Sequence, residues 1–405
     1  MNARSGTLAV IAVIAAAIGA VAVLVIGKAA GWVSTGGEKT VVVQTPGPAE
    51  AVANQKPVAP SAKPLVGNGF DPSRIYAARA PGVVTIYAIS GKDELSAQEA
   101  QGSGFVVSPK GYVLTNSHVI TNAGEGANRI KAADKLFVEF GDRDRVPAKV
   151  VGWDIYDDVG LLKVNPADHS LRPVPLGDSS RVRVGEPVAA IGSPFGNISS
   201  LSVGVVSATE RSIASLTSDY SLVDAIQTDA PINHGNSGGP LFDAKGRVIG
   251  INAQIRSDTG NAEGVGFAVP IDSAKRSMAQ LTAAGRVSYA YIGIETEDLI
   301  PAAARRFGYS VQHGAAIKTV RSGSPAAAAG LRAGTDTQEV LGTDFTGGGD
   351  VIVAIAGRKV ESAEDVVRVV TEQLSPGQSV PVTIVRGNER RRVTVKLAER
   401  PANPD

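Results

Sequence analysis

The chain of 405 residues contains no cysteine, which excludes disulfide bonds, thiolate metal sites and a cysteine nucleophile. Aromatic residues make up only 5% of it, and 40 basic residues nearly balance 39 acidic ones. A chain with almost no net charge has no general electrostatic attraction to nucleic acid, so no nucleic-acid partner is expected. The sequence also lacks a phosphate-binding loop, a zinc-protease motif and a calcium loop, so it implies no cofactor and no metal.

A long apolar segment stands near the start of the chain. Every residue from 8 to 26 is apolar or glycine, and a helix of this length spans about 28 Å, close to the core of a bilayer. We therefore expect a transmembrane helix at residues 8–27, behind a short N-terminal segment at 1–7. The alternative is a cleaved signal peptide. The usual orientation of a leading anchor predicts a single-pass protein of the cell membrane, with its folded domains on the extracytoplasmic side.

Two further regions follow from composition. Five prolines between residues 46 and 64 predict a flexible, extended Pro/Ala-rich linker over residues 34–70. Beyond it, short β-rich segments alternate with turns rich in glycine, of which the chain has 46 residues. This spacing is typical of a barrel or sandwich. The expected strands are Val83–Tyr87, Phe105–Val107, Tyr112–Thr115, Leu136–Phe140, Val159–Val164, Pro187–Ile191, Val203–Ala208, Arg247–Ile255 and Val265–Val269.

A helix is expected to close this first domain. It begins with Asp272 as its N-cap, carries Ala274 and Leu281 at helical spacing, and ends before Gly285. The first domain therefore covers residues 71–287, and a second domain follows at residues 288–400.

Three polar residues of the first domain form a candidate catalytic set. His118 follows a strand, Asp158 precedes an apolar strand, and Ser237 lies among glycines. A serine hydroxyl becomes a nucleophile when an imidazole takes its proton and a buried carboxylate orients that imidazole. The glycines let the N–H groups of Gly235 and Ser237 point at a developing oxyanion. Together, in the order His, Asp, Ser, these residues predict a serine hydrolase.

The segment Gly235–Gly239 also fits the G-x-S-x-G nucleophile elbow of α/β-hydrolases. In that fold the order along the chain is serine, acid, histidine, and a helix follows the serine. Here a strand follows Ser237, and the only later histidine, His313, belongs to the second domain. We therefore reject the elbow.

Six motifs surround the candidate residues. They are Thr115–Val119, Asp158–Lys163, Gly192–Gly196, Thr228–Ala230, Gly235–Pro240 and Gly264–Pro270. Together they resemble the motifs of the HtrA/Deg serine proteases. The resemblance runs from residue 71 to the C-terminus and implies a mainly β fold, with a trypsin-like double β-barrel followed by an α+β PDZ domain. It also suggests a homotrimer.

The same resemblance assigns roles. It implies that His118 is the general base, Asp158 its orienting acid and Ser237 the nucleophile of an acyl-enzyme mechanism. The doublet Asp157-Asp158 leaves open which acid acts, and the register against the following leucines favours Asp158. The family also usually has Ile-Ala or Leu-Ala after this acid, where Val-Gly follows here.

Resemblance further places the oxyanion hole and the substrate pocket. The oxyanion hole is expected at Gly235, Asn236 and Ser237. In trypsin-like folds an acid shortly before the nucleophile selects Arg or Lys, and none stands six residues before Ser237. The S1 pocket is therefore expected to be apolar, with Ile232 on its wall. The alternative is that Ile232 is plain core.

The second domain resembles an HtrA-type PDZ domain. In such domains a peptide C-terminus adds a strand to a sheet edge, and a backbone loop captures its carboxylate. A hairpin is expected over residues 380–397, and residues 335–348 are expected to be an inserted loop of unassigned role. The carboxylate-binding loop is assigned by resemblance to Tyr291, Ile292, Gly293 and Ile294.

Two functional hypotheses follow. The first is a membrane-anchored serine endopeptidase that cleaves misfolded or regulatory extracytoplasmic polypeptides and recognises peptide C-termini through the PDZ domain. The alternative is a catalytically silent scaffold that only binds peptides. Labelling by a fluorophosphonate, which reacts only with an activated serine, distinguishes the two.

Overall fold

The computed structural model describes residues 69–91, 98–123, 129–193, 200–218, 220–233, 235–255 and 265–401. The expected membrane segment at 8–27 and most of the expected linker lie outside these residues. Within the described part, no helix is both long and apolar enough to cross a bilayer.

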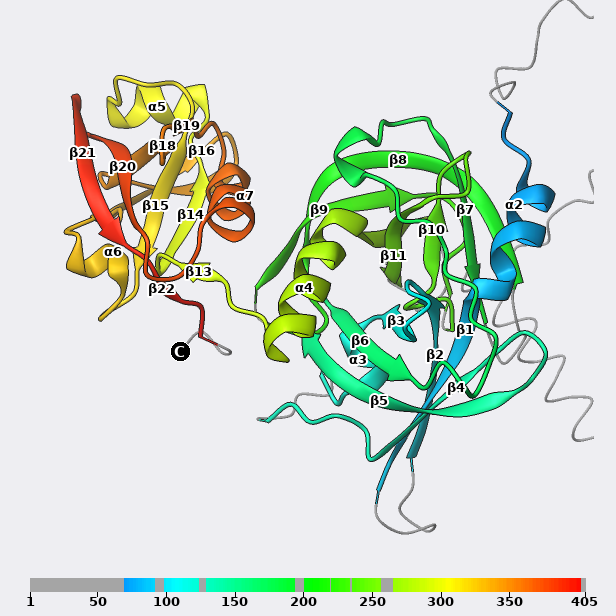
Figure 1. Cartoon of the computed structure of the whole chain (residues 1–405). Coiled ribbons are helices and arrows are strands. Elements are labelled where there is room, and N and C mark those ends of the chain that lie inside the picture. Colours follow the sequence, from blue (N-terminus) through cyan, green and yellow to red (C-terminus); the bar gives the residue numbers. More distant parts are fainter. Residues whose placement is uncertain are drawn as a thin grey trace, which may run out of the picture. The chain divides into compact units, whose positions relative to one another are not determined.

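Two closed six-stranded β-barrels form the first part of the described chain (Figure 1). Their strand orders are β1-β2-β3-β6-β5-β4 and β10-β11-β12-β9-β8-β7. The first barrel consists of β1 (Val83–Ser90), β2 (Gln98–Val106), β3 (Tyr112–Thr115), β4 (Lys135–Glu139), β5 (Arg145–Asp154) and β6 (Val159–Val164). The second consists of β7 (Pro187–Gly192), β8 (Ser200–Ala214), β9 (Ser221–Thr228), β10 (Pro240–Phe242), β11 (Val248–Ile255) and β12 (Gly266–Pro270).

An apolar core joins the two barrels. Phe105 and Leu114 of the first barrel belong to the same buried cluster as Ile191 and Ile251 of the second. Each barrel also has a smaller core of its own. Because the inner faces of both barrels are filled with side chains, loops at the seam between the barrels are held on rigid strands.

Short helices flank the barrels. They are α2 (Pro72–Arg79), the 3₁₀ turn η1 (Ala80–Gly82), α3 (Ser117–Ile120), the 3₁₀ turn η2 (Ser179–Arg181) and α4 (Ile271–Ala284). The expected helix near residue 272 is present and ends at Gly285, which adopts φ +71°. Its expected N-cap is wrong, because Pro270 takes that position. The Asp272 carboxylate instead accepts hydrogen bonds from the N–H and hydroxyl of Ser179, both at 2.8 Å.

The sequence did not predict strands β5, β9 and β10. Strand β9 contains Asp224 at φ +57°, and its pairing with β8 shifts register three times. Strand β5 has exposed residues, such as Arg145 and Lys149, among partly buried ones, and β10 has only three residues. Alternation of apolar and polar residues is weak in such strands, so the pattern gave no signal.

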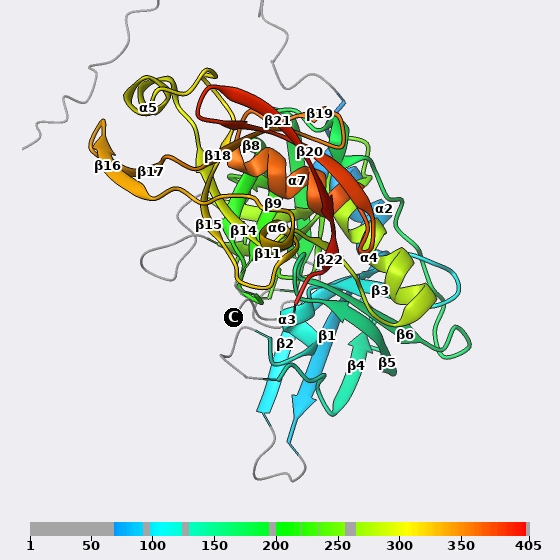
Figure 2. The ribbon, with the colours of Figure 1, turned by 90° about the vertical axis from the view of Figure 1, so that its left-hand side faces the viewer.

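The C-terminal domain is a sheet of order β14-β15-β18-β20-β21 with helix α7 against it (Figure 2). The expected hairpin over residues 380–397 is confirmed by the pair β20 and β21. The elements are β13 (Ala290–Tyr291), β14 (Ile294–Asp298), α5 (Pro301–Phe307), β15 (Ala315–Val320), α6 (Pro325–Ala328), β16 (Asp336–Val340), β17 (Thr343–Gly347), β18 (Asp350–Ile355), β19 (Arg358–Lys359), α7 (Ala363–Gln373), β20 (Ser379–Arg386), β21 (Glu389–Lys396) and β22 (Ala398–Glu399).

The expected insertion at residues 335–348 is not an irregular loop. It is a two-stranded hairpin, β16–β17, beside helix α5 (Figure 2). Val340 and Phe345 of the hairpin are buried in one cluster with Ala303, Tyr309 and Val351. The insertion therefore builds a second small core on this domain.

Candidate functional site

His118 and Asp158, which both follow strands of the first barrel, form a hydrogen-bonded pair. His118 lies in the short helix α3, and Asp158 lies in the turn between β5 and β6. The Nδ1 atom of His118 is 2.8 Å from Oδ2 of Asp158. The other carboxylate oxygen accepts the His118 backbone N–H at 3.1 Å and the Ser117 hydroxyl at 2.7 Å. With a proton on Nδ1 facing the carboxylate, Nε2 is left as a proton acceptor.

The backbone turns sharply at Asp158 to make this pairing. Its φ is +50°, which costs a residue with a side chain about 1–3 kcal/mol. The Asn116 side chain donates a hydrogen bond to the Asp158 carbonyl at 2.8 Å and helps to hold the turn. The preceding acid, Asp157, points elsewhere: its carboxylate lies 2.9 Å from the Tyr289 hydroxyl. The geometry therefore pairs the imidazole with the second acid of the doublet.

Two opposing effects set the pKa of His118. Burial lowers the pKa, whereas the charge of Asp158 and its hydrogen bond raise it. The net pKa lies above the ordinary value of 6.5. The imidazole is thus a stronger base than a free histidine, and it is protonated at slightly acidic pH.

Ser237 lies on a tight turn between Asn233 and strand β10. Gly238, the next residue, has φ +84°, and a Cβ there would lie 2.2 Å from the Ser103 carbonyl oxygen, so only glycine fits. The Ser103 N–H donates to the Ser237 carbonyl at 2.8 Å, which links the turn to strand β2. The Ser237 hydroxyl donates to the Ala253 carbonyl at 3.0 Å and makes no hydrogen bond with His118.

The expected oxyanion donors differ in their backbone contacts. Gly235 adopts φ +98°. Among the described residues, no backbone carbonyl takes the N–H of Gly235 or Ser237. The Asn236 N–H, in contrast, donates to the Asn233 carbonyl at 2.9 Å. With respect to the described backbone, Gly235 and Ser237 therefore keep N–H groups without an acceptor, whereas the N–H of Asn236 is used within the turn.

Two family models and several known proteins are similar to this chain. A family model described as a trypsin-like peptidase domain matches residues 102–251, and one described as a PDZ domain matches residues 290–397. The Arabidopsis thaliana protein "Protease Do-like 1, chloroplastic" is 34% identical over 334 residues, which are 81% of this chain and 72% of that protein. This chain belongs to the HtrA family of serine proteases.

Other HtrA proteins extend the comparison. A probable periplasmic serine endoprotease, DegP-like, of Hahella chejuensis is 39% identical over 76% of this chain and 59% of its own length. This chain spans 53% to 66% of the length of the first curated relatives it matches. The structure of the HtrA-type protease AlgW with a tripeptide is 31% identical, with a TM-score of 0.68 over 82% of this chain and 98% of AlgW.

Ile232, the residue expected on the wall of the S1 pocket, is deeply buried in this HtrA chain. Ile232 is only 2% exposed and belongs to the core of the second barrel with Ile226 and Leu241. A Cβ on Gly266 would lie 2.7 Å from Ile232, so the two residues are in close contact. His234, which we expected to be a loop residue without a catalytic role, lies outside the described residues.

The expected carboxylate loop of the PDZ domain lies between β13 and β14. Gly293 has φ +83°, and a Cβ there would lie 2.3 Å from the Ser324 side chain. The carbonyls of Ile292 and Gly293 accept N–H groups of Ala326 and Arg321, both at 3.0 Å. The loop is therefore fixed through its carbonyl groups. The neighbouring strand β14 is an edge strand of the sheet.

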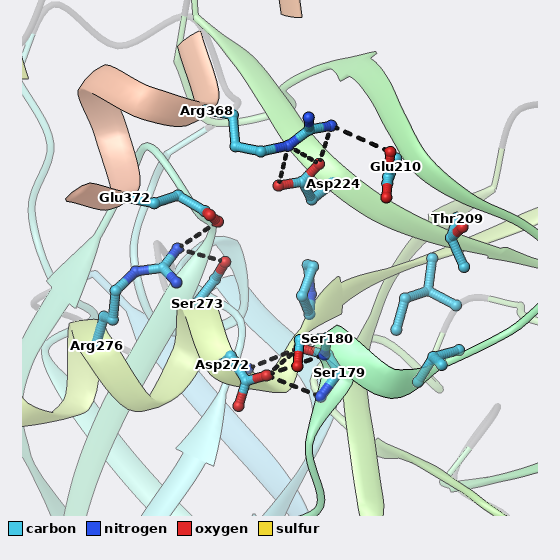
Figure 3. Close-up of a pocket in the computed structure, with 13 residues that line it drawn as sticks. Ser179, Ser180, Thr209, Glu210, Asp224, Asp272, Ser273, Arg276, Arg368 and Glu372 are labelled. Carbon is cyan, nitrogen blue, oxygen red and sulfur yellow. Dashed lines mark hydrogen bonds and ion pairs between the residues drawn. The ribbon is translucent and has the colours of Figure 1, made fainter. Parts of the chain in front are cut away.

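A separate hollow of about 300 Å³ lies among β9, α4 and α7 (Figure 3). Its charged side chains are paired with one another. Arg368 of α7 bonds Asp224 of β9 at 2.8 Å, and Arg276 of α4 bonds Glu372 of α7 at 3.0 Å. Because the charges satisfy each other, we interpret this hollow as a contact between the PDZ helix and the second barrel.

Sequence reasoning missed several residues that shape the site. Ser103 is fully buried, donates its hydroxyl to the Gly235 carbonyl at 2.5 Å, and accepts the Ser193 N–H at 2.9 Å. The Ser117 hydroxyl bonds Asp158 directly. Both are small polar residues beside glycine or histidine, and the only available signal was their place next to a recognised motif. Among the described residues, no cluster of potential ligands could hold a metal ion.

Proposed function

We propose that this chain is a serine endopeptidase that cleaves polypeptides by an acyl-enzyme mechanism. The observation that carries the proposal is the His118–Asp158 pair at 2.8 Å, in a chain whose Ser237 sits on a glycine turn with two free N–H donors. The HtrA relatives named as serine endoproteases support it. They give no support to a silent scaffold.

In this mechanism His118 Nε2 takes the proton of the Ser237 hydroxyl as the oxygen attacks the substrate carbonyl carbon. The negative charge on the carbonyl oxygen is held by the N–H groups of Gly235 and Ser237. The protonated imidazole, stabilised by Asp158, then gives its proton to the leaving amine. Water, deprotonated by the same imidazole, hydrolyses the acyl-enzyme and restores the serine.

The resting serine must first leave its present partner. The Ser237 hydroxyl donates to the Ala253 carbonyl, and a side-chain rotation toward His118 exchanges this hydrogen bond for one to Nε2. Such a rotation about χ1 is fast compared with turnover. The hydrogen bond of the Ser237 hydroxyl to Ala253 is therefore compatible with catalysis, because the side chain can rotate toward His118 once the substrate occupies the site.

The specificity of the proposed enzyme follows from its pocket. Pro231, Ile232 and Asn233 carry no charge, and burying an unpaired Lys or Arg beside them would be costly. We propose cleavage after small or medium aliphatic residues; because Ile232 is 2% exposed, we propose that it contributes to the pocket as an apolar residue packed beneath the wall.

The PDZ domain is proposed to bind peptide C-termini. Its loop is fixed through the carbonyls of Ile292 and Gly293, which leaves N–H groups of the loop to meet a carboxylate. The edge strand β14 beside the loop supports addition of a peptide strand.

The remaining expectations concern the whole protein. We propose a single-pass anchor at residues 8–27 and a linker at 34–70 that place residues 71–287 and 288–400 outside the cytoplasm. Relatives named as periplasmic support extracytoplasmic action, and the apolar run in the sequence supports the anchor. A homotrimer stays a prediction of the family resemblance, as does action on misfolded or regulatory proteins.

The deciding experiment is labelling of the purified chain by a fluorophosphonate, together with hydrolysis of casein. We expect labelling and cleavage by the wild type, and loss of both in Ser237→Ala, which keeps the fold. The backbone N–H groups at positions 235 and 237 remain in that variant and can still bind an oxyanion, so a weak residual rate is compatible with the proposal. Cleavage by Ser237→Ala at a rate near that of the wild type would contradict it.

A further inference from the structure

Two buried acids precede Asp158: Asp154 is the last residue of β5, and Asp157 lies in the turn between β5 and β6. Asp154 is fully buried, and Asp157 is 4% exposed. One oxygen of Asp154 accepts the backbone N–H groups of Tyr156 and Asp157, at 2.9 and 3.2 Å. The other accepts the Ser277 hydroxyl of helix α4 at 2.6 Å. These contacts fix Asp154 as the acid that closes the turn.

The carboxyl groups of Asp154 and Asp157 both contact the phenol hydroxyl of Tyr289. The Tyr289 hydroxyl lies 2.6 Å from Oδ2 of Asp154 and 2.9 Å from Oδ2 of Asp157. A phenol carries a single proton, so it can donate to only one of these oxygens. The other contact is a hydrogen bond only if the second carboxyl is itself protonated and donates to the phenol oxygen.

The surroundings decide which acid holds that proton. Burial raises the pKa of Asp154 as well, but its carboxylate accepts two N–H groups and the Ser277 hydroxyl, and these hydrogen bonds act to lower that pKa. Within the described part of the chain, the Asp157 carboxyl has the Tyr289 phenol as its one side-chain hydrogen-bond partner. The consistent arrangement is a chain of donors that runs from the Asp157 carboxyl to the Tyr289 oxygen, and from the Tyr289 hydroxyl to the Asp154 carboxylate.

Two arginines, one from helix α4 and one from the segment near the C-terminus, face this pair. Burial and the charge of Asp154 raise the pKa of Asp157 to about 7, whereas Arg276 of α4, the Tyr289 hydrogen bond and Arg400 near the C-terminus act to lower it. Arg400 lies about 5 Å from the rings of Tyr156, Tyr220 and Tyr289, at 5.2, 4.9 and 5.2 Å. Among the described residues, neither arginine makes an ion pair with either acid.

We propose that Asp157 and Tyr289 are positioning residues for catalysis, because their proton chain to Asp154 holds the turn that aims Asp158 at His118. The inference rests on the proposed protease activity. Asp157 and Asp158 are consecutive, so the direction of one side chain constrains the backbone of the other. Asp158 keeps φ +50° only while neighbouring contacts hold it there. Tyr289 also lies in the segment that connects α4 to the PDZ domain. Its contacts with Asp154 and Asp157 therefore attach this segment to the turn.

Loss of the Asp157 proton removes one of the two hydrogen bonds and leaves two buried carboxylates close to a single phenol proton. Repulsion between them then loosens the turn. A shift of about 1 Å at a catalytic group can lower the rate by about 100-fold, even without contact with the substrate. The expected consequence is a fall in kcat as Asp157 ionises, with little change in KM.

The first test replaces Tyr289 with phenylalanine. Tyr289→Phe removes the shared hydroxyl and keeps the ring, and we expect kcat to fall about 10- to 100-fold with KM changed less than about threefold. The matched control is Tyr156→Phe, which removes a hydroxyl from the same aromatic cluster. That hydroxyl lies 3.2 and 3.0 Å from the carbonyl oxygens of Arg400 and Pro401 and donates its one proton to a carbonyl rather than to an acid. The control should keep kcat within about twofold, since it breaks no contact of the acid pair.

The second test uses Asp157→Asn, which mimics the protonated acid and cannot ionise. In the wild type, kcat should decline as pH rises past about 7, and in Asp157→Asn this alkaline decline should be absent. Thermal unfolding of each variant separates a loosened turn from an unfolded chain. Equal kcat values for the two Tyr→Phe variants, or an alkaline decline that persists in Asp157→Asn, would overturn the inference. A wild-type chain that cleaves no peptide would instead refute the proposed function.

Discussion

Replacing Asp158 with asparagine is the sharpest test of the catalytic geometry. Asparagine keeps the size of the side chain but turns one acceptor oxygen into a donor. In the wild type, Oδ1 accepts two hydrogen bonds, from the Ser117 hydroxyl and the His118 N–H. Because these two donors need an oxygen, the amide group of the asparagine will face Nδ1 of His118.

This orientation reverses the tautomer of the imidazole. An N–H group facing Nδ1 requires Nδ1 to be an acceptor, so the ring proton moves to Nε2, which must take the proton of Ser237. In trypsin-like enzymes the equivalent wrong tautomer lowers kcat by about 10⁴-fold. The substitution also removes the charge that raises the pKa of His118, so burial alone will hold that pKa below its ordinary value.

The assay is kcat/KM for a peptide with an aliphatic residue at the cleaved position, measured from pH 5 to pH 9. Asp157→Asn is the comparison, because it changes the neighbouring acid that does not contact His118. We expect Asp158→Asn to lose about 10⁴-fold in kcat and Asp157→Asn to lose far less at pH 7. Activity of Asp158→Asn within tenfold of the wild type would refute the reasoning. A loss confined to Asp157→Asn would transfer the role to that residue.

Three further predictions follow from the site and the PDZ domain. Wild-type kcat/KM should fall as pH drops through the pKa of His118, which lies above 6.5, because only neutral imidazole accepts the serine proton; a flat profile down to pH 5 would exclude His118 as the base. Cleavage sites mapped by mass spectrometry should follow small or medium aliphatic residues, and a map dominated by Lys and Arg would contradict the neutral wall near Ile232. Gly293→Val should weaken binding of a free peptide C-terminus at least tenfold, because a Cβ meets Ser324 at 2.3 Å and φ is +83°. The same peptide with an amidated C-terminus should bind the wild type no better than the free peptide binds the variant, as titration by fluorescence anisotropy will show.

The spacing of short apolar strands predicted a barrel or sandwich, and the resemblance to the HtrA/Deg proteases predicted the double barrel and the PDZ domain. It also left few candidates for the general base of the reaction, since the chain has only four histidines. It could not predict β9, where Asp224 interrupts the strand at φ +57°. Nor could it predict that Asp272 bonds the Ser179 turn, because that contact joins residues 93 positions apart.

Long-range contacts explain the other failures. Tyr289 lies 135 positions from Asp154 and 132 from Asp157, and nothing in the local sequence marks it as a partner of two acids. The direction of the Ser237 hydroxyl toward Ala253 is likewise a property of the folded turn. Motifs identify residues that share a reaction, whereas only the packed chain defines which neighbours hold them in place.

The doublet Asp157-Asp158 shows how folding assigns chemistry to two identical side chains. Asp158 adopts φ +50°, a conformation that costs about 1–3 kcal/mol. Four hydrogen bonds offset this cost: one to its carbonyl and three to its carboxylate. Hydrogen bonds to a charged group contribute about 1.5–3 kcal/mol each, so the bonds outweigh the strain. Among the described residues, Asp157 has no such set of donors. Burial and the nearby charge of Asp154 therefore favour the protonated form of its carboxyl. One acid is therefore fixed by hydrogen bonds beside the base, and the other is kept available for protonation one residue away.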